Sequence, residues 1–259
     1  MNPMEIKGIC YLTYAGSIAY GTNTANSDVD IRGFYQESLA DIVSGKVKDT
    51  IEDSAADTVV YSLRHFVPLC KNANPNVLEL LGTRDEHVIF INDVGRLFRD
   101  NKHLFYSKRV FKTFGGYAMS QLRRIQDALV TDSYAELRHR NRKKDAAHFF
   151  KDAMHLIRLY LMGIDLLNGR GLQTYRENDL DLLRAIRNGD VELTEIFKMA
   201  DTFEEKLKVA YANSQLPPNP DEEAINQLLC QAYGIEKEGE KDENFTLAGK
   251  EKQIRRACS

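Results

Sequence analysis

The hydrophobic periodicity of the chain changes near residue 102, and this change limits the possible folds more than any other feature of the 259 residues. Before it, short runs of β-branched and aromatic residues alternate with helical patterns, and after it long segments repeat with the 3.6-residue period of a helix. The predicted strands are 9–14, 29–35, 57–61 and 87–91. The predicted helices are 62–71, 110–129, 146–167, 180–186, 193–211 and 220–233. This order predicts an α+β fold, in which a sheet domain is followed by an all-helical domain.

Two breaks help to divide the chain. The sequence 168–171, Asn-Gly-Arg-Gly, is typical of a helix C-terminus, and the proline-rich segment 216–221 favours a rigid turn before a final helix. We predict a sheet domain over residues 1–104 and a helical domain over residues 105–235. The charged segment 236–259 is expected to be a mobile tail.

Composition excludes several classes of protein. Hydrophobic residues make up 43% of the chain and charged residues 28%, which is typical of a folded protein and not of a disordered one. Lys and Arg number 35 against 38 Asp and Glu, so a surface that binds nucleic acid would have to be local.

The spacing of the cysteines and the length of the apolar segments predict an intracellular protein. The four cysteines form no C-x-x-C pair, which argues against a disulfide framework and against a structural zinc site. The most apolar helical stretch, 156–167, is interrupted by Arg158 and Asp165 and is too short to cross a bilayer. We therefore expect a soluble, cytoplasmic protein with no membrane partner.

The most informative motif follows the first predicted strand. Gly16 and Ser17 form a small turn, and after ten further residues Asp28 and Asp30 stand at the start of the next strand. Residues two apart on a strand point to the same face, so the two carboxylates are expected side by side. Such a pair is suited to Mg²⁺ or Mn²⁺, and the turn is suited to hold the phosphates of a bound triphosphate.

Two-metal phosphate chemistry requires a third carboxylate. We predict that Asp57, at the head of the next β-type run, completes the metal site with Asp28 and Asp30. Asp53 and Glu52 are alternatives that lie closer to a polar loop. Asp57 can also be interpreted as a carboxylate that ends a strand or forms a turn.

The Gly-Ser turn, the ten-residue gap and Asp-x-Asp resemble the signature of the polymerase-β-type nucleotidyltransferase superfamily. Within it, the chain resembles the YcgL/RlaP-like group in the segments 16–35, 74–81, 151–163 and 216–233, a likeness that covers residues 8 to 235. The resemblance implies a nucleotidyltransferase catalytic domain at the N-terminus and a divalent metal, Mg²⁺ or Mn²⁺. It implies that Gly16 and Ser17 hold the triphosphate and that Asp28 and Asp30 bind the metal. Arg32, on the same strand face, is expected to pair with a phosphate.

A second group of candidates lies on the predicted helix 146–167. Lys151, His155 and Arg158 match the central helical signature of the group and are predicted to bind the nucleotide. The alternative is a partly buried histidine face flanked by solvated charges. Glu79, flanked by leucines, is interpreted as an acid that tethers an arginine, as a surface residue or as a fourth catalytic acid.

Residues 102–158 contain thirteen Lys and Arg against five Asp and Glu, a local balance of +8. Beside a nucleotidyl-transfer site, such a region would attract RNA, although charge runs are also common on solvated helix faces. Arg142 and His148 fit loosely the spacing of HEPN-type ribonucleases, a pattern that arises easily by chance.

These observations predict an enzyme that transfers a nucleoside monophosphate from an NTP, expected to be ATP, to an acceptor hydroxyl such as an RNA end. Two alternatives remain open. One is a nucleotidyltransferase that modifies a protein or a small molecule, as in AMPylation. The other is a module that binds nucleotides without turnover.

Overall fold

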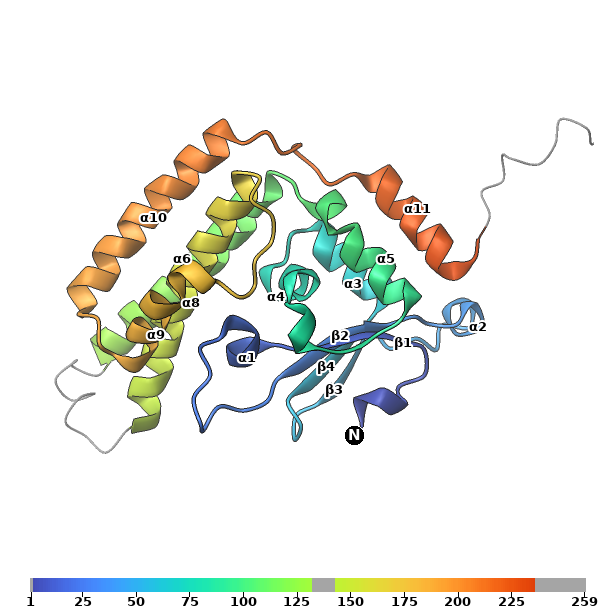
Figure 1. The fold of residues 1–259 in the computed structure, drawn as a ribbon, viewed down its shortest axis with the longest axis horizontal. Coiled ribbons are helices and arrows are strands. Elements are labelled where there is room, and N and C mark those ends of the chain that lie inside the picture. The colour runs from blue at the N-terminus through green and yellow to red at the C-terminus, as the bar shows by residue number, and fades with distance from the viewer. Residues whose placement is uncertain (1, 132–142, 236–259) are drawn as a thin grey trace, which may run out of the picture.

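The computed structural model describes residues 2–131 and 143–235, which form a five-stranded sheet covered by helices and a neighbouring helical part (Figure 1). The strands are β1 (Ile9–Tyr14), β2 (Ile31–Tyr35), β3 (Thr50–Asp53), β4 (Thr58–Ser62) and β5 (Val88–Ile91). The α-helices are α1 (Gly16–Tyr20), α2 (Leu39–Val43), α3 (Leu63–Lys71), α4 (Pro75–Leu78), α5 (Asp93–Asp100), α6 (Arg109–Thr131), α8 (Lys143–Leu167), α9 (Leu180–Asn188), α10 (Leu193–Asn213) and α11 (Glu222–Tyr233). The 3₁₀ turns are η1 (Pro3–Glu5), η2 (Glu79–Gly82), η3 (Asp85–His87), η4 (Lys102–Phe105) and η5 (Glu177–Asp179). The predicted α+β class and the four predicted strands are confirmed, and β3 was missed.

The sheet is mixed, with the strand order β3-β4-β2-β1-β5. β1 pairs antiparallel with both β2 and β5, and β3 pairs antiparallel with β4. β2 and β4 are parallel, with Ile31 opposite Thr58 and Tyr35 opposite Ser62. Both strands therefore begin at the same edge of the sheet, which is also the edge where β1 ends.

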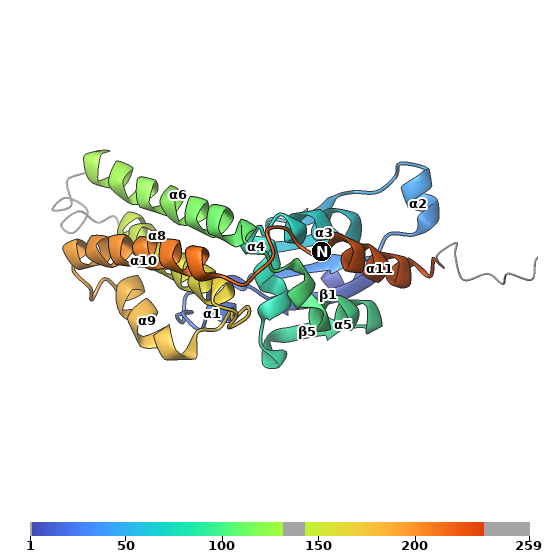
Figure 2. The same cartoon turned by 90° about the horizontal axis from the view of Figure 1, so that it is seen from above.

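The two faces of the sheet bury different amounts of apolar surface. One face carries a small cluster of Leu12, Tyr35 and Val60, flanked by Ile6, which follows η1, and by partly buried residues of the strands. On the other face, Tyr11 and Phe34 belong to a large core that continues through α3 and α5 into the helical part. Because this core is continuous, the sheet and the helices pack as one body, and Figure 2 shows them side by side along the long axis of the molecule.

Helix α8 is the centre of the helical part and contacts α6, α9 and α10. Met154, Leu156 and Ile157 are fully buried on it. Its two charged interruptions, Arg158 and Asp165, are buried as well, and each pairs with an opposite charge from elsewhere in the fold. This pairing explains how the most apolar segment of the chain accommodates charges, because a buried charge is tolerated when it is paired.

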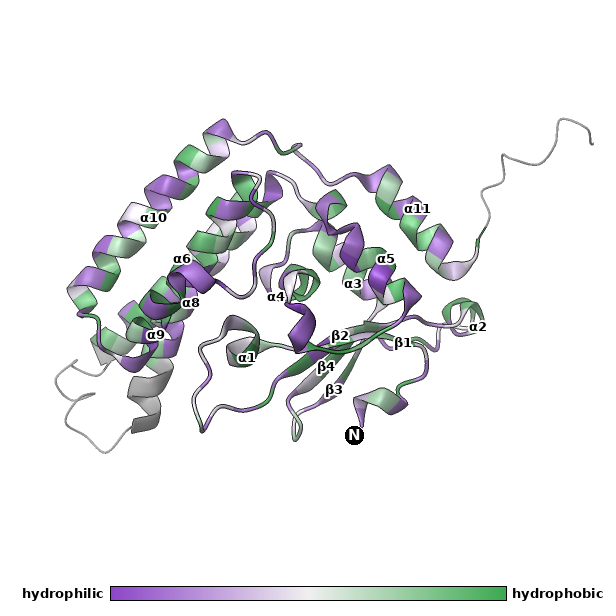
Figure 3. Cartoon of the chain, in the orientation of Figure 1, coloured by the Kyte–Doolittle hydropathy of each residue, from purple (hydrophilic) through white to green (hydrophobic). Residues whose placement is uncertain are grey.

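The last described helix, α11, returns to the sheet part. It contacts α5 and η4, and the side-chain amide of Gln36 donates to the carbonyl oxygen of Ala232 at 2.7 Å. Figure 3 shows hydrophobic and hydrophilic residues alternating along α10 and α11, as expected for helices with one buried face. The division at residues 104 and 105 stays a prediction, and the segment 236–259 lies outside the described residues.

None of the helices within residues 2–131 and 143–235 is both long and apolar enough to span a membrane. Cys10, Cys70 and Cys230 are unpaired thiols, two of them buried, and Cys258 lies outside the described part of the chain.

Candidate active site

The turn after β1 and the starts of β2 and β4 meet at one edge of the sheet. The backbone N–H of Ala15 donates to the carbonyl oxygen of Asp30 at 2.9 Å, and the N–H of Ile31 donates to the carbonyl oxygen of Asp57 at 3.0 Å. These bonds hold together three segments of the chain, of which the first, at Ala15, and the last, at Asp57, are 42 residues apart in the sequence. The parallel register of β2 and β4 is what places Asp57 beside Asp30.

Gly16 brings the backbone into contact with the Asp30 carboxylate. Its φ is +54°, a left-handed conformation that favours glycine, and it opens α1. A Cβ atom at this position would lie 2.1 Å from Oδ2 of Asp30 and 2.8 Å from its Cγ. The next residue, Ser17, is buried at the start of α1. Only glycine fits at position 16 without displacing the carboxylate.

We predict that Gly16→Ala lowers nucleotidyl transfer by about 100-fold or more, because shifts near 1 Å at a reacting centre have effects of this size. The added methyl group collides with Asp30, and the left-handed backbone costs about 1–3 kcal/mol for a residue other than glycine. Transfer kinetics and chemical unfolding measure the two effects.

Gly45→Ala is the matched control. Gly45 also has a positive φ, +68°, but nothing lies within 4 Å of its added Cβ. This variant is expected to lose a comparable amount of stability while retaining activity. Equal activity in the two variants would contradict the role given to the turn.

Arg32 links the two carboxylates at the sheet edge. Its Nη2 donates to Oδ1 of Asp57 at 2.8 Å and to Oδ1 of Asp30 at 3.2 Å, and its Nη1 donates to the carbonyl oxygen of Asp57. The side chains of Asp30 and Arg32 are 20% and 22% exposed, whereas that of Asp57 is 48% exposed. The cluster is thus enclosed on the Asp30 side and open on the Asp57 side.

The two carboxylates have pKa values shifted in opposite directions. Burial, together with the hydrogen bond and negative charge of Asp57, raises the pKa of Asp30 to about 6, against the opposing effects of Arg32 and Lys151. The hydrogen bond from Arg32 lowers the pKa of Asp57 below its ordinary value. Such an arrangement indicates two acids held close enough to repel, a situation that a bound cation relieves.

The other acids of this region lie in different positions. Asp28 is exposed in the extended segment before β2 and does not line the cavity described below. Glu52, on β3, does line the cavity, while Asp53 is at the end of β3 and accepts a hydrogen bond from the N–H of Ala55. The structure therefore brings Asp30 and Asp57 together, whereas Asp28 stays outside the lining of the cavity.

A cavity of about 380 Å³ opens between this sheet edge and the helices α1, α8 and α9. It is large enough for a small-molecule ligand. Six predicted site residues line it: Gly16, Ser17, Asp30, Arg32, Lys151 and His155. In Figure 1, α1 lies between the strands β2 and β4 on one side and α8 and α9 on the other. The sheet thus contributes the acidic wall of the cavity and the helical part contributes a basic one.

Lys151 and His155 lie one helical turn apart on α8 and face the carboxylates. The charge of Lys151 lowers the pKa of both Asp30 and Asp57. Burial holds the pKa of His155 well below its ordinary value, with further lowering by Arg158, Lys151 and Arg187. His155 is therefore a neutral imidazole at pH 7, able to donate or accept a hydrogen bond without adding charge.

Arg158 lies behind the cavity and does not line it. Its Nη1 donates to Oε2 of Glu79 at 2.7 Å, and both side chains are almost fully buried. The Tyr20 hydroxyl donates to Oε1 of Glu79 at 2.6 Å, and the Arg158 guanidinium stacks 3.6 Å from the centre of the Tyr20 ring. Of the three roles considered for Glu79, the structure shows the acid that tethers an arginine. The prediction that Arg158 binds nucleotide directly stays a prediction.

This buried cluster positions the walls of the cavity. Glu79 belongs to η2 and Tyr20 to α1, and the Tyr20 ring meets His155 edge to face with ring centres 5.7 Å apart. The cluster therefore connects α1, η2 and α8. Tyr20 was not predicted as a site residue, because a tyrosine in a helix is most often a core residue.

Part of the basic region 102–158 lies outside the described residues. Residues 132–142, with Arg138, Arg140 and Arg142, lie outside the described residues, and so do the side chains of 143–148. The RNA-binding role of the region and the HEPN-like pair Arg142 and His148 therefore remain untested.

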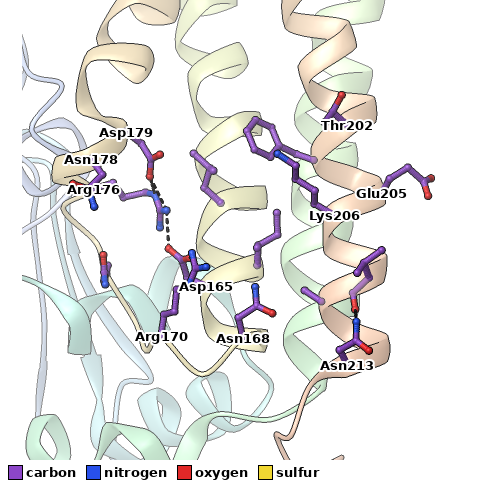
Figure 4. Close-up of a pocket in the computed structure, with 16 residues that line it drawn as sticks. Asp165, Asn168, Arg170, Arg176, Asn178, Asp179, Thr202, Glu205, Lys206 and Asn213 are labelled. Carbon is purple, nitrogen blue, oxygen red and sulfur yellow. Dashed lines mark hydrogen bonds and ion pairs between the residues drawn. The ribbon is translucent and has the colours of Figure 1, made fainter.

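A second and larger groove, of about 910 Å³, lies between α8, α10 and the segment 168–179 (Figure 4). Asp165 accepts hydrogen bonds there from Arg176 at 2.7 Å and from Arg170 at 3.1 Å. None of the predicted site residues lines this groove, and its charges are largely paired with one another. The predicted site residues that line a cavity therefore lie at the smaller one.

The donor set at the sheet edge fits a divalent cation of the hard, oxygen-binding type. Asp30 and Asp57 supply carboxylate oxygens, and their mutual repulsion is the signal that a cation would be favourable. Within residues 2–131 and 143–235 no three His, Cys, Asp or Glu side chains gather as a metal-binding group. A nucleotide phosphate would complete the shell, as Mg²⁺ commonly requires.

Comparison with known proteins agrees with this geometry. Residues 2–231 match the family described as RlaP, the RNA repair pathway DNA polymerase beta family. The chain belongs to this family. The resemblance drawn from the motifs is thereby confirmed, and RlaP membership marks the chain as a polymerase-β-type nucleotidyltransferase associated with RNA repair.

Two individual proteins are also similar to this RlaP chain. An uncharacterised 38.9 kDa protein of the nrdC–mobD intergenic region of Enterobacteria phage T4 is 31% identical over 122 residues, which is 42% of this chain and 36% of the phage protein. The match thus spans about a third of that protein. The crystal structure of a nucleotidyltransferase-like protein from Exiguobacterium sibiricum 255-15 is 12% identical, with a TM-score of 0.26, and the match covers 88% of this chain and 72% of that one.

Proposed function

We propose that the protein is a Mg²⁺-dependent nucleotidyltransferase that moves a nucleoside monophosphate from ATP to a hydroxyl group at an RNA end. One observation carries the proposal. A glycine turn in contact with Asp30 forms one wall of a cavity whose other wall holds Lys151 and His155, and Arg32 links Asp30 to Asp57 at the edge of that cavity's acidic wall. A nucleoside triphosphate and its cation require this combination of a backbone turn, carboxylates and positively charged side chains.

In the proposed reaction, an acceptor hydroxyl oxygen forms a bond to the α-phosphorus of the NTP while the bond from that phosphorus to the bridging α,β-oxygen breaks. Pyrophosphate leaves, and the hydroxyl proton passes to solvent. A divalent cation held by Asp30 and by Asp57, the predicted third carboxylate, with Asp28 as the other predicted ligand, would lower the pKa of the hydroxyl and neutralise the leaving group.

The residues of the chain contribute positioning. The backbone at Gly16 and the Ser17 hydroxyl hold phosphate oxygens where β1 turns into α1. Arg32, which pairs with both aspartates, keeps the carboxylates at the sheet edge and can turn its remaining donors to a phosphate. Lys151 offers a positive charge to the triphosphate, and neutral His155 a hydrogen bond.

An RNA acceptor is supported by the family description and by the +8 balance of residues 102–158. A large helical half also argues for a macromolecular acceptor, because it adds surface beside the catalytic sheet. A protein or small-molecule acceptor, and nucleotide binding without turnover, are outcomes that the following experiment distinguishes.

The test incubates the protein with each α-labelled NTP, Mg²⁺ and total cellular RNA, and sorts the label into RNA, protein and small-molecule fractions. We expect label from ATP in RNA, with at least a thousandfold less in the Asp30→Asn variant. Label confined to protein or to small molecules would replace the RNA acceptor. Tight nucleotide binding with no label in any fraction would overturn the proposed transfer.

A further inference from the structure

One cation at the cavity was assigned no role by the sequence. Arg187 lies in the last turn of α9 and lines the same cavity as Gly16, Ser17 and Lys151. In the sequence it resembles the basic residue that commonly ends a helix, where it would interact with the helix dipole. The fold instead directs it to the candidate active site.

The other arginines near the cavity are held by carboxylates. Arg32 pairs with Asp30 and Asp57, and Arg158 pairs with Glu79. By contrast, no carboxylate pairs with Arg187 within the described part of the chain, and its buried Nη1 has no hydrogen-bond partner; the buried Nε of Arg158 also lacks one, but Glu79 already neutralises that side chain. A buried guanidinium donor without a partner is costly, so such a group indicates a ligand that is bound during function.

Arg187 is also held in place. Arg184, one turn earlier on α9, donates its Nε to the carbonyl oxygen of Gly21 at 2.9 Å and so joins α9 to the end of α1. Gly189, just beyond the helix, packs against the ring of Phe150 on α8. These two contacts anchor α9 on both sides of Arg187, to the end of α1 and to α8. The charge of Arg187 reaches His155, whose pKa it lowers.

Three features favour a phosphate as the missing partner. A guanidinium forms paired, charge-assisted hydrogen bonds with phosphate oxygens. The wall that Arg187 shares with Lys151 has no carboxylate of its own lining the cavity, since the lining acids are Asp30 and Glu52 on the sheet and Glu79, which Arg158 neutralises. Burial lowers the pKa of Arg187, a cost that a bound anion would reverse.

We propose that Arg187 binds the β- or γ-phosphate of the nucleotide and thereby makes the site selective for a nucleoside triphosphate over a monophosphate. This inference rests on the proposed function, because it assumes that the reacting α-phosphate lies by Asp30 and Asp57. The opposite wall, where Arg187 lies, then receives the triphosphate tail.

The test measures binding by calorimetry, with Mg²⁺ and two probes, α,β-methylene-ATP and AMP. For Arg187→Gln we expect about tenfold or weaker affinity for the triphosphate analogue and a change of less than about twofold for AMP. Arg187→Lys should recover part of the lost affinity, because it keeps the charge. Thermal unfolding should show no loss of stability, since no native partner is removed.

Arg96→Gln is the matched control, because it makes the same chemical change at an exposed position of α5 outside the cavity. The inference is overturned if Arg187→Gln binds the triphosphate analogue as the wild type does, or if both probes are weakened equally. A wild-type protein that binds neither probe would instead overturn the proposed function itself.

Discussion

Asp30→Asn is expected to lower nucleotidyl transfer by about a thousandfold or more while leaving the fold intact. The amide has the shape of the carboxylate but lacks the charge that a divalent cation requires. Asp30 is the acid nearest the glycine turn and the more enclosed of the two adjacent carboxylates. Its loss therefore removes the centre of the proposed site.

Stability should respond in the opposite direction from activity. Burial and the neighbouring Asp57 raise the pKa of Asp30 to about 6, so the carboxylate that Asp30 carries at pH 7 is less stable in the folded, metal-free protein than in the unfolded chain. A neutral amide removes this unfavourable charge, so the free energy of unfolding should be unchanged or higher. Transfer kinetics and denaturant unfolding at pH 7 check the two expectations.

Asp49→Asn is the matched control, because Asp49 is an aspartate with a side chain 59% exposed that pairs with Arg64 away from the cavity. It should leave transfer unchanged. Asp30→Asn with activity within tenfold of the wild type would remove the site assignment.

The largest loss of stability is expected from Glu79→Ala. This change leaves the Arg158 guanidinium buried without its carboxylate and removes the acceptor of the Tyr20 hydroxyl. Breaking one side of a buried ion pair typically costs about 3–5 kcal/mol. Denaturant unfolding should show this loss as a lower midpoint with a similar slope.

Two further variants make the interpretation specific. Glu79→Leu combined with Arg158→Met should recover much of the loss, because it removes both charges and keeps the volume. Glu86→Ala, which breaks an exposed pair with Arg84, should cost less than about 1 kcal/mol. If Glu79→Ala behaved like Glu86→Ala, the buried cluster could not be what joins α1, η2 and α8.

The fold was largely readable because its elements have clear periodicity. The four predicted strands are rich in β-branched and aromatic residues, and the long helices keep an apolar stripe over several turns. β3 was missed for a physical reason. Its four residues, Thr-Ile-Glu-Asp, contain one apolar side chain and form an edge strand that is partly exposed, so no hydrophobic alternation marks it.

The proximity of the candidate site residues could be predicted only where they are close in the sequence. Gly16, Ser17 and Asp30 belong to one short motif, and their contact follows from the turn between β1 and β2. Asp57 was predicted to reach Asp30 only because it precedes the next strand. The parallel register of β2 and β4, which brings the two residues together, has no signature in the sequence. Arg187 required the docking of α9 on α1 and α8.

ATP labelled at either the α- or the γ-phosphate distinguishes transfer of a nucleotidyl group from transfer of a terminal phosphate. With Mg²⁺ and acceptor RNA, we expect α-label to become covalently bound to the acceptor while γ-label is released as pyrophosphate, in equal amounts. Transfer of γ-label to the acceptor with release of ADP would show that the protein is not a nucleotidyltransferase.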